Sequence, residues 1–378
     1  MRLKFFAVLS LFLVGLFLVD PAMGQRNKYS KRKSGNKKVS GYRGGSGSGK
    51  FRPYEYLAYG VNAMNYYGDL APLSRAASTD VSFTRPGTGI TYGARFSENI
   101  ALRANYNFGR IKGDDVSSDP TSTADNPRYS RNLSFRNNIH EFNIGANFYF
   151  LPDNNAATYR NPINIYLFVG GGFFLHEPKG KVPEYDYQTH GPNAAQENAP
   201  GIEEEIEGVT AGEWVKLRPL NTEGQGSGLE GTTEPYKPFQ WQIPVNLGVD
   251  LAIPRTYLSI GLEFGLRYLF TDYLDDVSGK YANLDQFDNS LARIMSDRSV
   301  EPTNGFNTVE RDLSLVNTSQ GSFNGTPYYY GVDIGSGING SIRGNPNDND
   351  TYFLTQIKIK LIMPPNGIFG KKADAKFR

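Results

Sequence analysis

Alternation of apolar and polar residues with a period of two is the feature that most limits what this chain can fold into. It recurs in eight segments and is clearest in residues 258–270. There Leu262 and Leu266 fall on one side of an extended chain, and Glu263 and Arg267 fall on the other. A slip of one residue would turn both charges toward the apolar side, so this pattern suits a strand with one face on lipid and one on a lumen.

The other seven segments repeat the pattern with varying regularity. Alternation is regular in residues 100–109, 139–150, 239–251 and 351–363, and less regular in residues 54–66, 88–97 and 163–175.

The links between these segments alternate in length. Short links occupy 97–99, 152–162 and 254–256, and long links occupy 67–87, 111–138, 178–238 and 272–350. Outer-membrane barrels alternate short periplasmic turns with long outer loops. We therefore predict an all-β fold, an eight-stranded antiparallel transmembrane β-barrel over residues 53–364, with both termini in the periplasm.

The N-terminus predicts export. Arg2 and Lys4 precede the apolar run from Phe5 to Val19, and Ala22-Met23-Gly24 offers a cleavage site. We expect residues 1–24 to be a signal peptide, and no later run of about 18 apolar residues suggests a spanning helix. A soluble sandwich or lipocalin-like barrel also has alternating strands, with the apolar face inward. The link lengths and the export signal favour the cell outer membrane.

Residues 25–52 form a basic segment rich in Gly and Ser, with ten basic residues and no acid. Such a segment buries too little apolar surface to fold alone, so we expect a disordered periplasmic tail. Anionic lipid headgroups, the cell wall or an acidic protein are its expected partners, and not nucleic acid, with an inert spacer as the alternative. Residues 365–378 are expected to form a short periplasmic C-terminal tail. The basic residues of the N-terminal tail are Arg26, Lys28, Lys31, Arg32, Lys33, Lys37, Lys38, Arg43, Lys50 and Arg52.

The lumen of an eight-stranded barrel is narrow, so side chains are expected to fill it. Opposite charges should pair there because an unpaired buried charge is costly. A lumen plugged by ion pairs is therefore favoured over a diffusion pore. The five cations exceed the three acids, which indicates either a register error or neutralisation by loop carboxylates. The predicted inward charges are Arg95, Arg103, Arg267, Lys358 and Lys360 with Glu141, Asp250 and Glu263.

No catalytic or cofactor site stands out. His190 falls in a loop, while His140 and His176 fall near outer strand ends, where an interfacial histidine is the expected role. No Gly-x-Ser-x-Gly nucleophile elbow is present, so a lipid-modifying enzyme is disfavoured. The glycine-rich stretch 44–50 imitates a phosphate-binding loop, but Phe51 replaces the required Ser or Thr.

No metal site is expected. The chain has no cysteine, which excludes a zinc–cysteine site. Acid-rich stretches raise the question of calcium, but they lack EF-hand spacing and are expected to be solvated loop carboxylates. These acids are Asp272, Asp275, Asp276, Asp285 and Asp288, and the run Glu203, Glu204, Glu205 and Glu207.

Three segments near the outer strand ends carry a family resemblance. They are Tyr66-Tyr67-Gly68-Asp69-Leu70, the stretch 270–279 with Asp272, Tyr273, Asp275 and Asp276, and Asn349-Asp350-Thr351-Tyr352-Phe353. Over residues 54–364 the chain resembles the PorG-like outer-membrane barrel component of the type IX secretion system of Bacteroidota. The resemblance implies a non-enzymatic barrel, linked to a periplasmic ring made by a lipoprotein and its partner, in a system of protein secretion and gliding motility.

The chain departs from shorter members of that family in its basic tail and in the link 178–238, so contacts made by those regions are not inherited. A small outer-membrane pore or a ligand-binding barrel is the rival interpretation.

Overall fold

The computed structural model describes residues 51–363 except 52, 72–84, 119–126, 154–159, 228–232, 324–325 and 333–339. The described residues belong to one compact unit that starts at Gly49. The expected signal peptide, residues 25–50 and 52 of the basic tail, and residues 364–378 lie outside them.

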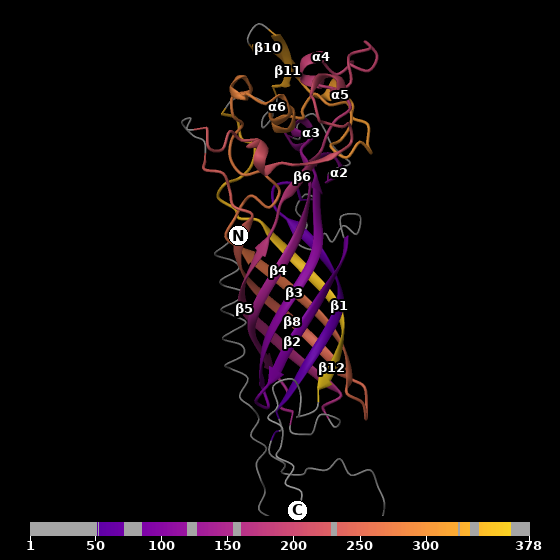
Figure 1. Ribbon diagram of the computed structural model, residues 1–378, viewed down its shortest axis with the longest axis vertical. Coiled ribbons are helices and arrows are strands. Elements are labelled where there is room, and N and C mark those ends of the chain that lie inside the picture. Colours follow the sequence, from indigo (N-terminus) through magenta and orange to yellow (C-terminus); the bar gives the residue numbers. More distant parts are fainter. Residues whose placement is uncertain are drawn as a thin grey trace, which may run out of the picture. The chain divides into compact units, whose positions relative to one another are not determined.

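Eight antiparallel strands form a closed barrel (Figure 1). Each of the eight strands pairs with its neighbours in chain order, and β1 pairs with β12, with Tyr59 opposite Ile359, so the barrel is closed. This confirms the predicted fold class. The strands are β1 (Tyr54–Tyr67), β2 (Arg85–Arg95), β3 (Ile100–Asp114), β4 (Ser134–Tyr149), β5 (Ile163–Leu175), β8 (Phe239–Ala252), β9 (Leu258–Leu269) and β12 (Thr351–Met363).

Burial alternates along every regular strand. In β9, Leu262 and Phe264 face outward and are about two-fifths exposed, whereas Glu263 and Arg267 are buried in the lumen. Ile144 and Ile357 are 71% and 61% exposed on the outward face. A contiguous apolar surface of this kind is rare on soluble monomers, and a lipid environment accounts for it.

β3 and β4 are longer than the sequence pattern predicted. They extend five residues past the expected boundaries, to Asp114 and back to Ser134, and remain paired throughout. Arg110, Lys112 and Arg136 occupy outward positions in this extension, so its outward face is no longer apolar. Loss of the apolar signal is why these residues looked like loop.

The long links fold into a cap at one end of the barrel (Figure 1). β6 extends the sheet at the cap end of β4, β7 pairs with β6, and β10 pairs with β11. Figure 1 shows the short helices grouped in this cap. The cap elements are α2 (Asp115–Ser118), α3 (Pro127–Arg131), β6 (Pro178–Lys181), α4 (Tyr187–His190), α5 (Ile202–Glu205), β7 (Trp214–Lys216), η2 (Arg218–Leu220), η3 (Leu284–Gln286), α6 (Ser290–Ser296), η4 (Leu313–Leu315), β10 (Thr318–Phe323) and β11 (Thr326–Gly331).

One hydrophobic core joins the barrel to the cap. Met64, Phe135 and Leu354 at the upper end of the lumen belong to the same buried cluster as Leu274 and Met295 in the cap. Within the described ranges no helix is long and apolar enough to cross a membrane.

Candidate functional site

The middle of the lumen is organised around Glu263. Its carboxylate accepts two hydrogen bonds from Arg103, at 2.6 and 3.0 Å, and one from Lys358 at 2.7 Å. The Tyr166 hydroxyl donates a further hydrogen bond at 2.6 Å, and Asn246 donates another at 2.8 Å. The single negative charge of Glu263 therefore faces the two positive charges of Arg103 and Lys358, and all three side chains are buried.

A second ion pair lies nearer the cap. Arg267 donates two hydrogen bonds to Glu141, at 2.9 and 2.7 Å, and neither side chain is exposed. The Tyr352 hydroxyl donates to Glu141 at 2.6 Å, and Asn107 donates at 2.6 Å. Charge-assisted and bidentate bonds of this kind fix the side chains that fill the lumen.

The remaining cations lie toward the end of the barrel opposite the cap. Lys360 pairs with Asp250, and its ammonium lies 4.4 Å from the ring centroid of Tyr56. Arg95 pairs with Asp153 at 3.2 Å, and Asp153 lies in the short link between β4 and β5. A loop carboxylate thus offsets part of the excess positive charge, which is one of the two explanations that the sequence left open.

Aromatic side chains close the end of the lumen opposite the cap. Tyr54, Tyr56, Tyr149, Tyr166 and Phe168 form a buried cluster there. A Cβ on Gly248 would lie 2.2 Å from the Tyr166 ring, so only glycine leaves room for that ring to fill the lumen. With the ion pairs above it and the cap core above those, the barrel interior is filled with side chains.

The segments that carry the family resemblance meet beneath the cap. The Tyr66 hydroxyl lies 2.5 Å from Asp275 Oδ2 and 3.0 Å from Asp350 Oδ1, and Asp350 also accepts a hydrogen bond from the Leu274 backbone at 2.8 Å. A Cβ on Gly68 would lie 1.9 Å from Asp350 Oδ1. The motif residues therefore hold the cap on the barrel rim.

The acids of the second motif are buried, which corrects the expectation that they are solvated. Asp275 and Asp276 are almost fully buried and Asp272 is 7% exposed. Asp276 accepts hydrogen bonds from Thr222 at 2.5 Å and Tyr236 at 2.6 Å. The sequence showed no long-range partners for these acids, so their local composition was misleading.

Tyr273 and the other acids take different positions. Tyr273 stacks on Tyr236, with ring centroids 4.8 Å apart, and bonds Thr233 at 2.9 Å. Asp288 and the Glu203–Glu207 acids are exposed, as expected, and Asp285 is half-buried. In the part of the chain that the structure describes, no group of three or more acids or histidines is placed to hold a metal ion.

The three histidines have different surroundings. His140 packs against the rings of Tyr106 and Phe108 toward the cap end of the barrel, which fits an interfacial role. His190 pairs with Glu205 in the cap. His176 was expected at the interface but is buried between Phe174 and Tyr236, and burial lowers its pKa to about 4.

The buried carboxyl groups of Asp272, Asp275 and Asp350 predict that the cap loses stability as pH rises. Burial raises the pKa of Asp272 to about 8, and burial with neighbouring carboxylates raises the pKa of Asp275 and of Asp350. An unfolded aspartate has a pKa of about 3.9, so the folded cap holds protons that the unfolded chain releases. The stabilisation that Asp272 gives the folded cap is therefore fully present below about pH 4 and is lost as pH rises to about 8. Over that range the free energy of unfolding falls by at most about 1.4 kcal/mol per pH unit for this group.

Asp272→Asn should flatten this dependence between about pH 6 and 8, because a neutral group already occupies the site. Cap unfolding can be followed by the fluorescence of Trp214 in a Trp241→Phe background, since the chain has two tryptophans. Cap stability that rises with pH in this window, or an unchanged slope in Asp272→Asn, would contradict the argument.

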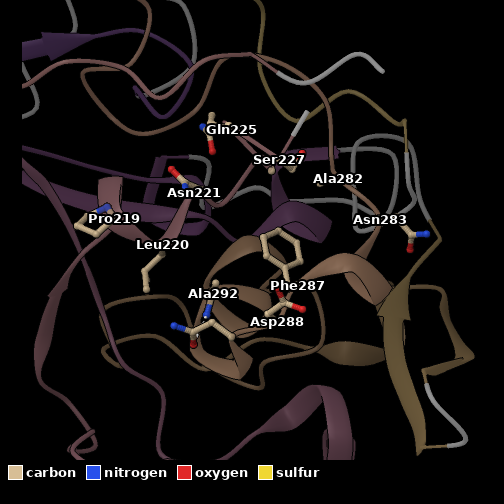
Figure 2. A pocket seen from close by; sticks show the side chains of 13 residues that line it. Pro219, Leu220, Asn221, Gln225, Ser227, Ala282, Asn283, Phe287, Asp288 and Ala292 are labelled. Atoms are coloured by element: carbon tan, nitrogen blue, oxygen red, sulfur yellow. Dashed lines mark hydrogen bonds between the residues drawn. The ribbon is translucent and has the colours of Figure 1, made fainter. Parts of the chain in front are cut away.

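A small pocket opens in the cap between the segments 219–227 and 282–292 (Figure 2). Its volume is about 260 Å³, and Leu220, Phe287 and Ala292 supply apolar lining beside the amides of Asn221 and Gln225. Figure 2 shows the Phe287 ring near the centre of this lining.

Comparisons with known proteins give a partial family match. Residues 55–190, less than half of the chain, match a family described as a domain of unknown function (DUF6089). No curated protein matches the sequence.

Several solved structures are similar to this chain at low sequence identity. Ail, the attachment invasion locus protein of Yersinia pestis, in complex with the heparin analogue sucrose octasulfate, is 5% identical with a TM-score of 0.31, over 83% of this chain and 100% of that chain. The outer membrane protein OprG from Pseudomonas aeruginosa is 6% identical with a TM-score of 0.33, over 84% and 98%. Neisserial surface protein A is 9% identical with a TM-score of 0.30, over 81% and 96%. That the barrel is closed is shown by the strand pairings within this chain.

Proposed function

We propose that this chain is a non-enzymatic barrel of the outer membrane that anchors the periplasmic ring of a type IX secretion system. The filled lumen is the observation that supports a structural role. Glu263 and Glu141 hold three cations across the barrel, and aromatic residues and the cap core fill the space below and above them. Because the lumen is filled, we infer that the barrel acts through partners that bind its surfaces and not through transport across its interior.

The link to the ring is supported by the resemblance of three segments to the PorG-like family. Those segments form one buried contact, in which Tyr66 bridges Asp275 and Asp350. The periplasmic docking surface would then consist of the short turns and the basic tail. Phe51, near the C-terminal end of the tail, packs against Tyr54, and its ring centroid lies 6.0 Å from the guanidinium carbon of Arg95.

Affinity purification tests the anchoring role. A C-terminally tagged barrel extracted in mild detergent should recover the ring lipoprotein and its partner. A variant lacking residues 26–50 should recover less if the tail contributes, while its barrel stays folded. Failure of the intact chain to recover the ring lipoprotein would contradict the proposal.

Conductance separates this proposal from the rival pore. The purified protein in planar bilayers should show no single-channel currents, because the lumen is filled with paired charges and aromatic rings. Reproducible currents from the folded protein would favour the pore instead.

A further inference from the structure

Four basic residues form a continuous row across the outward face of the extended barrel wall. Lys112 on β3 lies opposite Arg136 on β4, Arg136 opposite Lys179 on β6, and Lys179 opposite Lys216 on β7. The inward neighbours along these strands, such as Phe135, are buried, so the four side chains face outward. We call these four residues the basic row.

The basic row is unfavourable for the sheet that carries it. Like charges directly opposite each other across strands destabilise a sheet, and here three such pairs follow one another. Lys216 forms a salt bridge with Glu177 at 2.7 Å, and Arg218 forms a second salt bridge with the same carboxylate at 3.5 Å. Arg136 and Lys179 have no salt bridge to any carboxylate in the described ranges. Two adjacent cations at the centre of a row of like charges, with no carboxylate paired to either in the described ranges, indicate an external anion.

Trp214 prepares Arg136 for such an anion. The guanidinium carbon lies 3.8 Å from the centroid of the Trp214 ring. Stacking occupies the flat face of the guanidinium and leaves its N–H edge for a ligand, and that edge matches the oxygen atoms of a phosphate.

The position of the basic row relative to the membrane identifies the anion. Tyr106, Phe108, His140 and Phe142 form an outward-facing aromatic cluster on β3 and β4. Aromatic girdles mark the membrane–water interface of outer-membrane barrels. Lys112 follows Phe108 by four residues along β3, which places it about 10 Å beyond the girdle for a tilted strand. This is the level of lipid headgroups.

We propose that the basic row binds the phosphates of the anionic glycolipid in the outer leaflet of the outer membrane. Arg136 and Lys179 contribute charge that no carboxylate of the described residues neutralises, and Lys112 and Lys216 extend the surface on either side. The proposal rests on the outer-membrane placement with the cap outside, and not on the periplasmic ring.

The test uses the full mature chain in neutral detergent, with bisphosphorylated lipid A as the probe and fully dephosphorylated lipid A as its neutral counterpart. Native mass spectrometry counts bound lipid, and a binding titration gives the affinity. The test variant is Arg136→Gln with Lys179→Gln, which keeps aliphatic stems and removes two charges. The control is Arg255→Gln with Lys280→Gln, which removes two exposed cations from the β8–β9 turn and the cap.

Wild type and control should bind bisphosphorylated lipid A equally, and the test variant should bind at least about tenfold more weakly. Binding should weaken with salt, and inorganic phosphate at matched concentration should compete poorly. In lipid-free detergent the test variant should unfold at the same or a higher temperature than wild type, because it removes repulsion. Unchanged affinity in the test variant, equal binding of dephosphorylated lipid, or complete competition by inorganic phosphate would overturn the proposal. Recovery of the ring has no influence on any of these results.

Discussion

Glu263→Gln should lower the free energy of unfolding by about 3–5 kcal/mol, because it leaves two buried cations without a carboxylate. Arg103 donates two hydrogen bonds to Glu263, and Lys358 donates one at 2.7 Å. The glutamine keeps the shape of the side chain, so the loss reports charge and not packing. Urea unfolding of the refolded protein in detergent, followed by tryptophan fluorescence, measures it.

The matched control is Glu207→Gln in the cap, whose side chain is exposed and which should change stability by less than about 0.5 kcal/mol. Adding Lys358→Met to Glu263→Gln should restore part of the loss, because one of the two unpaired cations is then gone. Equal stability of Glu263→Gln and wild type would show that the lumen admits water and that the network is not buried.

The second large effect is expected on the outward face. Ile357→Arg should destabilise the barrel in lipid by about 2–4 kcal/mol, because it places a charge near the middle of the apolar band. Ile357 lies between Val61 and Leu262 on the neighbouring strands and is 61% exposed. Unfolding in phospholipid vesicles is the measurement.

Ile342→Arg is the control for exposure, since Ile342 is 63% exposed but lies in the cap. It should leave stability unchanged within about 0.5 kcal/mol, because arginine is well solvated there. Similar effects of the two substitutions would mean that the outward face of β12 does not contact lipid.

The barrel could be predicted from the sequence because its signals are local. Strand alternation places Leu262 and Glu263 on opposite faces whatever the rest of the chain does. The same parity brought Arg103, Glu141, Glu263 and Arg267 into the lumen without any knowledge of which strands are neighbours. Local signals ended where β3 and β4 leave the lipid, since Arg110 and Lys112 there break the apolar face.

The cap could not be predicted, because its contacts join distant segments. Asp275 meets Tyr66, which is 209 residues away, and Arg343 meets Glu223, which is 120 residues away. The composition of the segment 270–279 suggested solvated acids, but residues from distant segments bury them. The basic row was missed for the same reason, although the alternation of Ile111 with Lys112 and of Phe135 with Arg136 carried a signal for it.

The central claim is that the strands cross the outer membrane with the cap outside and the short turns in the periplasm. Because the chain has no cysteine, single-cysteine variants labelled with a membrane-impermeant maleimide test it most directly. In intact cells Ile342→Cys in the cap should react, Arg255→Cys in the β8–β9 turn should react only after the outer membrane is permeabilised, and Ile357→Cys on β12 should react only after denaturation. Labelling of Ile357→Cys or Arg255→Cys in intact cells, with Ile342→Cys protected, would contradict the account.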